Sequence, residues 1–82
     1  MIEIFGDTHC VWCERAKKLC EDNQLTYTYK GIQEPGVLTQ LQEKLDHVRT
    51  VPQVFWNGRH IGGYQELATE IEDTRNFGQE SI

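Results

Sequence analysis

The feature that most constrains the fold is a β-hairpin predicted in the second half of the chain. Two short runs, residues 54–56 and 59–61, are joined by Asn57-Gly58. The Asn-Gly dipeptide tolerates the positive φ angles of a type I′ turn, which pairs two antiparallel strands. Because 82 residues have room for one small core, we expect this hairpin to belong to the single sheet of a single domain, residues 1–82.

The first half of the chain predicts a strand, a helix and a second strand. Residues 2–5 and 25–29 are short β-prone runs, and the intervening segment from Val11 to about Asp22 has apolar residues at helical spacing. A strand, helix and strand in succession imply a right-handed crossover with parallel pairing. The predicted apolar face of the helix consists of Trp12, Ala16, Leu19 and Cys20.

Two further helices complete the predicted order. A second amphipathic helix, with Val37, Leu38, Leu41 and Leu45, ends near residue 46, and Leu67, Ala68 and Ile71 mark a third after Gly62-Gly63. Residues 76–82 are polar, and we expect them to fray. The order βαβ-α-ββ-α predicts an α/β fold, with a four-stranded mixed sheet and helices on both faces.

Composition and charge exclude several classes of function. No apolar run approaches the ~20 residues that span a bilayer, and the net charge of −5 disfavours nucleic acid and anionic membranes as partners. The first five residues lack a basic segment and a long apolar segment, so we expect no secretory signal and a cytoplasmic location.

Cys10-Val11-Trp12-Cys13 carries the predicted chemistry. The thiolate is the attacking form of cysteine, and a helix N-terminus lowers the thiol pKa from ~8.5 by directing N–H groups at the sulfur. Cys10 lies at that place, just before the predicted helix, and two intervening residues let Cys13 reach it. We therefore predict Cys10 as the exposed nucleophile and Cys13 as the more buried resolving thiol.

Other uses of these side chains remain open at this point. C-x-x-C is also half of a zinc site, but His9, Cys20, His47 and His60 offer no second pair at a recognised spacing, so no metal is expected. Cys20 is interpreted as a small core residue rather than a third redox thiol. His9 either tunes the thiolate or has no role.

Val51-Pro52 is the second functional element. Pro52 directly precedes a predicted strand, where a cis peptide bond would turn the Val51 N–H and C=O outward. An exposed backbone pair beside a thiolate can hold an extended peptide as an added strand. A trans proline that simply begins the strand is the alternative.

Taken together, these segments resemble dithiol glutaredoxins of the thioredoxin-fold superfamily, over about residues 1–75. The resemblance is carried by four motifs in order: C-V-W-C, Ala16-Lys17, Thr50-Val51-Pro52 and Gly62-Gly63-Tyr64. It implies a cis Pro52 and a glutathione groove. The implied groove residues are Trp12, Thr50, Val51, Pro52, Gly63, Tyr64 and Gln65.

The resemblance also implies an activity. Cys10 would attack a disulfide, and Cys13 or glutathione would resolve the mixed disulfide. Glutathione is the implied reductant, disulfide-containing proteins are the implied substrates, ribonucleotide reductase among them, and we expect a monomer. The alternatives are a redoxin recycled by thioredoxin reductase, an iron-sulfur carrier bridged by Cys10 and glutathione, and a purely structural cysteine pair.

Two residues depart from the family pattern. Val11 stands where the family commonly has Pro, which is expected to change the reduction potential. Asp7 stands where a basic residue is frequent, and its charge opposes both anion binding and thiolate formation. Lys44, Arg49 and Arg59 are candidates to compensate.

Overall fold

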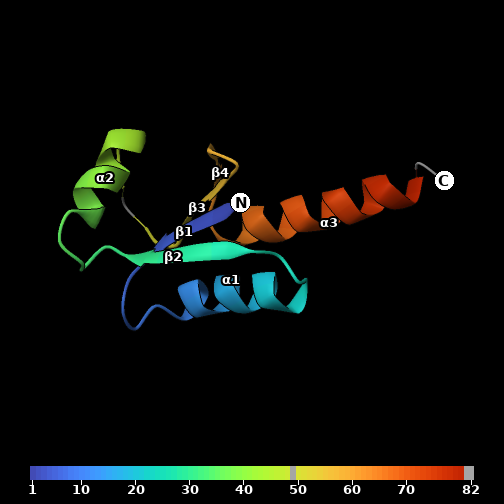
Figure 1. The fold of residues 1–82 in the computed structure, drawn as a ribbon, viewed down its shortest axis with the longest axis horizontal. Coiled ribbons are helices and arrows are strands. Elements are labelled where there is room, and N and C mark those ends of the chain that lie inside the picture. Colours follow the sequence, from blue (N-terminus) through green and yellow to red (C-terminus); the bar gives the residue numbers. More distant parts are fainter. Residues whose placement is uncertain (49, 81–82) are drawn as a thin grey trace.

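The predicted order of elements is confirmed by the structure, a computed structural model that describes residues 1–48 and 50–80, with side chains described as far as residue 73. The described residues form four strands and three helices, labelled in Figure 1. They are β1 (Ile2–Gly6), α1 (Val11–Asp22), β2 (Tyr27–Gly31), α2 (Val37–Lys44), β3 (Gln53–Trp56), β4 (Arg59–Gly62) and α3 (Tyr64–Glu80).

The strands form one mixed sheet in the order β2-β1-β3-β4. β1 lies in the middle, parallel to β2 and antiparallel to β3, and β3 continues into β4 as the predicted hairpin. Asn57 and Gly58 adopt φ angles of 53° and 84°, the positive values that a two-residue hairpin turn requires. The parallel crossover through α1 and the hairpin are both as the sequence predicts.

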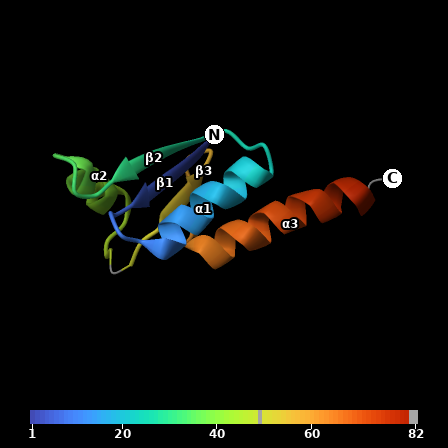
Figure 2. The ribbon, with the colours of Figure 1, turned by 90° about the horizontal axis from the view of Figure 1, so that it is seen from below.

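Helices cover both faces of the sheet. α1 and α3 lie side by side on one face and α2 lies on the other (Figures 1 and 2). Successive residues of β1 point to opposite faces, so Ile4 packs beneath α1 and α3 while Phe5 packs against Leu41 of α2. The buried residues on the α1 and α3 side are Ile2, Ile4, Ala16, Cys20, Val54, Leu67 and Ile71.

The second strand begins two residues later than predicted, because α1 ends in a hydrogen-bonded turn. Gln24 has a φ of 58°, its N–H donates to the Glu21 carbonyl, and the Leu25 N–H donates to the Cys20 carbonyl at 2.9 Å. This pair of bonds is the Schellman arrangement that satisfies the last carbonyls of a helix. Leu25 therefore belongs to the capping motif that follows α1, and β2 starts at Tyr27.

Two other sequence expectations need correction. Trp12 does not share the buried face of α1: the residue is 49% exposed, and its ring lies against Tyr64 of α3. α3 continues to Glu80, past residue 76, where fraying was expected to begin. Residues 81 and 82 lie outside the described part of the chain. No helix in the described part is long and apolar enough to cross a membrane.

Candidate active site

The two cysteines of the C-x-x-C motif form a disulfide at the start of α1. Cys10 is the N-cap residue, and its sulfur accepts a hydrogen bond from the backbone N–H of Cys13 at 3.1 Å. The two Cα atoms are 5.2 Å apart. Cys10 is partly exposed, whereas Cys13 is fully buried, which confirms the predicted difference in exposure.

The Val51-Pro52 peptide bond is cis, as expected, and it lies next to Cys10. The Cys10 sulfur is 3.8 Å from the carbonyl oxygen of Val51, although the two residues are 41 positions apart in the chain. Pro52, immediately before β3, is buried, whereas Thr50 is exposed. The segment thus presents backbone polar groups beside the more exposed sulfur.

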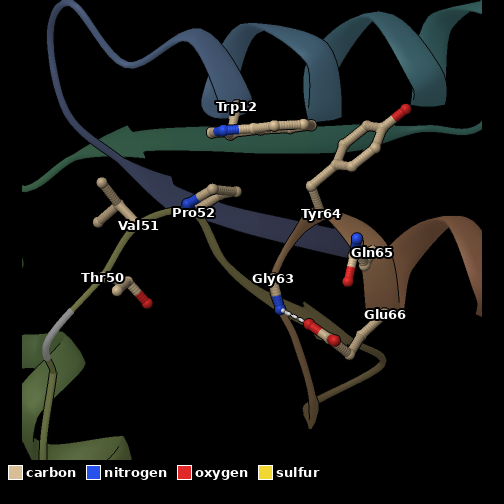
Figure 3. A pocket seen from close by; sticks show the side chains of 8 residues that line it. All are labelled: Trp12, Thr50, Val51, Pro52, Gly63, Tyr64, Gln65 and Glu66. Carbon is tan, nitrogen blue, oxygen red and sulfur yellow. Dashed lines mark hydrogen bonds between the residues drawn. The ribbon is translucent and has the colours of Figure 1, made fainter.

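A pocket of about 270 Å³ opens beside this segment. Figure 3 shows the indole of Trp12 along one side, the Thr50 to Pro52 segment along a second side, and the beginning of α3 along a third. The rings of Trp12 and Tyr64 lie 5.3 Å apart, centroid to centroid. The lining residues are Trp12, Thr50, Val51, Pro52, Gly63, Tyr64, Gln65 and Glu66, so the structure brings together all seven predicted groove residues.

Glu66 is the pocket residue that the sequence analysis missed. Its carboxylate accepts a hydrogen bond from the Gly63 N–H at 2.7 Å, and the Gly63 carbonyl accepts one from the Leu67 N–H at 3.0 Å. Glu66 is thus the third residue of α3 reaching back to the N-cap, half of a capping box. The signal was present in the sequence, because a glutamate follows Gly63 at the required spacing.

Glycine is required at position 62 for this arrangement. Gly62 has a φ of 121°, and a Cβ atom there would lie 2.7 Å from Cγ of Glu66. Any other side chain would therefore push Glu66 away from the start of α3. Gly63, Tyr64 and Gln65, at the beginning of α3, line the pocket (Figure 3), and the first N–H groups of a helix have no partner within the helix.

Lys44 and Arg59, two of the three cations considered as compensation for Asp7, do not line the pocket. The Lys44 ammonium lies 5.4 Å from the Phe55 ring on the α2 side, and Arg59 pairs with Glu70 at 3.0 Å. Arg49 lies outside the described residues. The guanidinium of Arg15, which the sequence analysis overlooked, lies 4.6 Å from the centroid of the ring of Trp12, a pocket residue.

Cys20 is separate from this site. It is fully buried in the core between α1 and the sheet, as interpreted from the sequence. Burial, with a smaller contribution from the Glu21 carboxylate, raises the pKa of its thiol to about 11. His9, next to Cys10, is exposed and has a φ of 61°. Within the described part of the chain, no three His, Cys, Asp or Glu side chains are grouped to hold a metal ion.

The fold and the site together define a class of protein. A mixed sheet with this strand order, a C-x-x-C pair at the N-terminus of α1 and a cis-proline segment beside the first cysteine make this a thioredoxin-fold thiol-disulfide oxidoreductase. The glutaredoxin family model matches residues 2–61. The chain belongs to the glutaredoxin family.

Individual relatives agree with this assignment. The chain is 38% identical over 77 residues to glutaredoxin 1 of Escherichia coli K12, an alignment that covers 85% of this chain and 91% of the relative. The solution structure of reduced E. coli glutaredoxin superimposes with a TM-score of 0.77 at 35% identity, covering 92% and 96% of the two chains. A buckwheat glutaredoxin-glutathione complex matches with a TM-score of 0.74 at 31% identity, covering 89% of this chain and 69% of that one.

Proposed function

We propose that this member of the glutaredoxin family reduces protein disulfides and glutathione mixed disulfides, with glutathione as its reductant. The observation that carries the proposal is the position of the pocket. Its lining includes all seven residues expected to hold glutathione, and one of them, Val51, has its carbonyl oxygen 3.8 Å from the Cys10 sulfur.

Cys10 is the proposed nucleophile. The Cys13 N–H already donates to its sulfur, and a helix N-terminus favours negative charge, so the geometry favours a thiolate at this position. The Cys10 thiolate attacks one sulfur of a substrate disulfide, a mixed disulfide forms, and the other substrate sulfur leaves with the electron pair. Cys13 then attacks the Cys10 sulfur, releasing the reduced substrate and forming the disulfide seen in the structure.

Glutathione would return the enzyme to its dithiol form from the pocket. Its cysteinyl backbone would pair with the exposed backbone of Val51, next to Thr50 and Pro52, as in an added β-strand. Its γ-glutamyl carboxylate would meet the N–H groups of Tyr64 and Gln65 in the first turn of α3. Gly63, the third predicted donor, already donates to Glu66, so the carboxylate would share or take over that N–H.

Two further observations support a glutathione site. The exposed ring of Trp12 forms a wall that a tripeptide could cover, with the Arg15 guanidinium against the same ring. A buckwheat glutaredoxin of the same fold is described in complex with glutathione. A glutathione-driven cycle needs a pool of reduced glutathione, so we place the protein in the cytoplasm. We propose that it acts as a monomer on disulfide-containing proteins, with ribonucleotide reductase as a candidate substrate.

Serine variants of the two cysteines test the proposal. Cys10→Ser should abolish glutathione-coupled reduction of disulfides, because it removes the attacking sulfur. Cys13→Ser should lose reduction of protein disulfides that need the second thiol but retain removal of glutathione from mixed disulfides. Cys20→Ser is the matched control, since Cys20 is buried away from the site, and should remain active. Activity in the Cys10 variant would refute the assignment.

The reductant itself is tested by recycling. Oxidised protein is incubated with glutathione and glutathione reductase in one reaction, and with thioredoxin reductase in another, and NADPH consumption is followed in both. Rapid turnover with glutathione alone is the expected result. Turnover with thioredoxin reductase alone would favour the other redoxin class.

A further inference from the structure

Reduction of the Cys10–Cys13 disulfide forms a thiolate at the buried sulfur of Cys13, and no described residue that lines the pocket is known to stabilise that charge. When a reductant attacks the Cys10 sulfur, the Cys10–Cys13 bond breaks and its electron pair moves to the Cys13 sulfur. That sulfur is completely inaccessible to solvent. An anion formed without a nearby donor or positive charge is costly, so the protein must supply one of these behind Cys13.

Tyr29 of β2 brings a hydroxyl group to this place. At Gly6, a Cβ atom would lie 2.3 Å from the Tyr29 hydroxyl oxygen and 2.8 Å from the Cys13 sulfur. The two atoms therefore approach the same point on the Gly6 backbone from different elements, β2 and α1. Because residue 6 has no side chain, this space is left to the hydroxyl and the sulfur.

The hydroxyl is held in a way that lets it turn. It donates a hydrogen bond to the backbone carbonyl of Asp7 at 3.2 Å, at the long end of the usual range for a hydroxyl donor. Asp7 belongs to the loop that leads to Cys10, so the acceptor lies beside the same dithiol. Rotation about the C–O bond of the phenol re-aims the proton without moving the ring.

A positive charge stands behind the ring. The Lys17 ammonium lies 4.3 Å from the centroid of the Tyr29 ring and pairs with Glu14 at 3.1 Å. Burial raises the pKa of the Tyr29 hydroxyl, with Lys17 lowering it and Glu14 and Asp7 raising it further. The phenol thus stays protonated at neutral pH and is available as a donor.

We propose that Tyr29 is a positioning residue for the resolving step: its hydroxyl turns from the Asp7 carbonyl to donate a hydrogen bond to the Cys13 sulfur as that sulfur becomes a thiolate, with Lys17 supplying positive charge behind the ring. The reverse step, attack of the Cys13 thiolate on a mixed disulfide at Cys10, passes through the same arrangement. The inference rests on the proposed role of Cys13 as the resolving thiol.

The variant Tyr29→Phe removes the hydroxyl but keeps the ring and its contact with Lys17, so it tests the proposed hydrogen bond to the Cys13 sulfur. Dithiothreitol is the reductant, so that the outcome does not depend on glutathione. Dithiothreitol reduces the Cys10–Cys13 disulfide in one series, and the Cys10–glutathione mixed disulfide of Cys13→Ser in a second series. In the first series Tyr29→Phe should slow reduction by about tenfold, the value of a hydrogen bond to a charged group. In the second series, where Cys13 is absent, the same change should have no effect.

Tyr27→Phe is the matched control, because the Tyr27 hydroxyl lies on the same strand but bonds to Glu21. It should leave both series unchanged. If Tyr29→Phe slows both series equally or slows neither, the proposal is wrong. If Tyr29→Phe does not fold, Lys17→Gln replaces it and should slow the first series only. Failure of glutathione to recycle the protein, by contrast, would overturn the proposed reductant and leave these two series intact.

Discussion

The sulfur of Cys10 accepts a hydrogen bond from the backbone N–H of Cys13 at 3.1 Å. Cys10 thus takes the place that an oxygen-bearing side chain usually occupies at a helix N-cap, and it exposes its sulfur to the N–H groups of the first turn of α1. A contact that caps the helix also favours the charged form of the proposed nucleophile. The extended backbone of Cys10 in this contact also bears on whether a proline can follow it at position 11.

Val11→Pro should stabilise the protein. Val11 is the first residue of α1, where Pro is well tolerated because the N–H there has no partner within the helix. Cys10 has φ −102° and ψ 106°, the extended conformation that a residue preceding Pro requires. We expect a gain of about 0.4–1 kcal/mol in the free energy of unfolding in urea, through a stiffer unfolded chain. Val11→Ala should give no such gain, and a loss of stability in Val11→Pro would contradict the capping geometry.

Asp7→Asn should make Cys10 more reactive. The Asp7 side chain accepts a hydrogen bond from the Thr8 N–H at 2.7 Å, and asparagine keeps that acceptor while removing the negative charge. Asp7 is three residues from Cys10 along the chain, and loss of one unit charge acting through water at roughly 10 Å is worth about a twofold change. Alkylation of reduced Cys10 by iodoacetamide should therefore accelerate about twofold at low salt, and less at high salt.

Asp22→Asn is the control for that experiment, since Asp22 ends α1 at the opposite end from Cys10. It should leave the alkylation rate of Cys10 unchanged. Equal acceleration in both variants would show a general effect of net charge. No acceleration in Asp7→Asn would show that the Asp7 charge does not reach the sulfur.

Gly6→Ala should destabilise the protein through a clash at the back of the dithiol. The new Cβ would lie closer than 3.0 Å to the Tyr29 hydroxyl and to the Cys13 sulfur, so both side chains must shift. Overpacking of this kind costs about 1–3 kcal/mol in the free energy of unfolding. In the Tyr29→Phe background the cost should be smaller, because one of the atoms in the clash is gone. Equal costs in the two backgrounds would mean that the hydroxyl lies elsewhere.

The parts of the fold that could be predicted from sequence are those with local causes. Asn57-Gly58 specifies its turn by backbone preference alone, and the helical spacing within α1 follows from burial on one face. The start of β2 could not be found in this way. Its position depends on Gln24 taking a positive φ, and Gln, unlike Gly, gives no signal for that conformation.

In the candidate site, too, residues within sequence motifs could be predicted, whereas residues placed only by the folded chain could not. Six of the seven expected pocket residues belong to the motifs that carry the family resemblance, and the seventh, Gln65, follows the last motif. The structure brings all seven together. Tyr29 and Arg15 could not be recognised beforehand, because only the folded chain places them beside their neighbours at the site, Cys13 in one case and Trp12 in the other. Trp12 was assigned to the wrong face for a related reason, since its partner, Tyr64, is distant in sequence.

Cys20 should make stability depend on pH in the alkaline range. Burial raises the pKa of its thiol from 9.0 to about 11 in the folded protein, so between these values the unfolded chain loses a proton that the folded protein keeps. The contribution is fully present below pH 9 and is lost as the pH rises toward 11. Two pKa units correspond to a loss on the order of 2–3 kcal/mol in the free energy of unfolding.

Urea denaturation of the protein at a series of pH values from 8 upward, compared with Cys20→Ala, measures this loss. The variant should be less stable at pH 8 because it leaves a small cavity, but its stability should fall less steeply between pH 9 and 11. Tyr27→Phe identifies the contribution of a second group that titrates at alkaline pH. The hydrogen bond to Glu21 raises the pKa of Tyr27 from 10.0 to about 12. The plot of unfolding free energy against pH for this variant should therefore differ in slope from that of the native chain only above pH 10. Parallel curves for Cys20→Ala and the native chain would show that the Cys20 thiol ionises as readily in the folded protein as in the unfolded one.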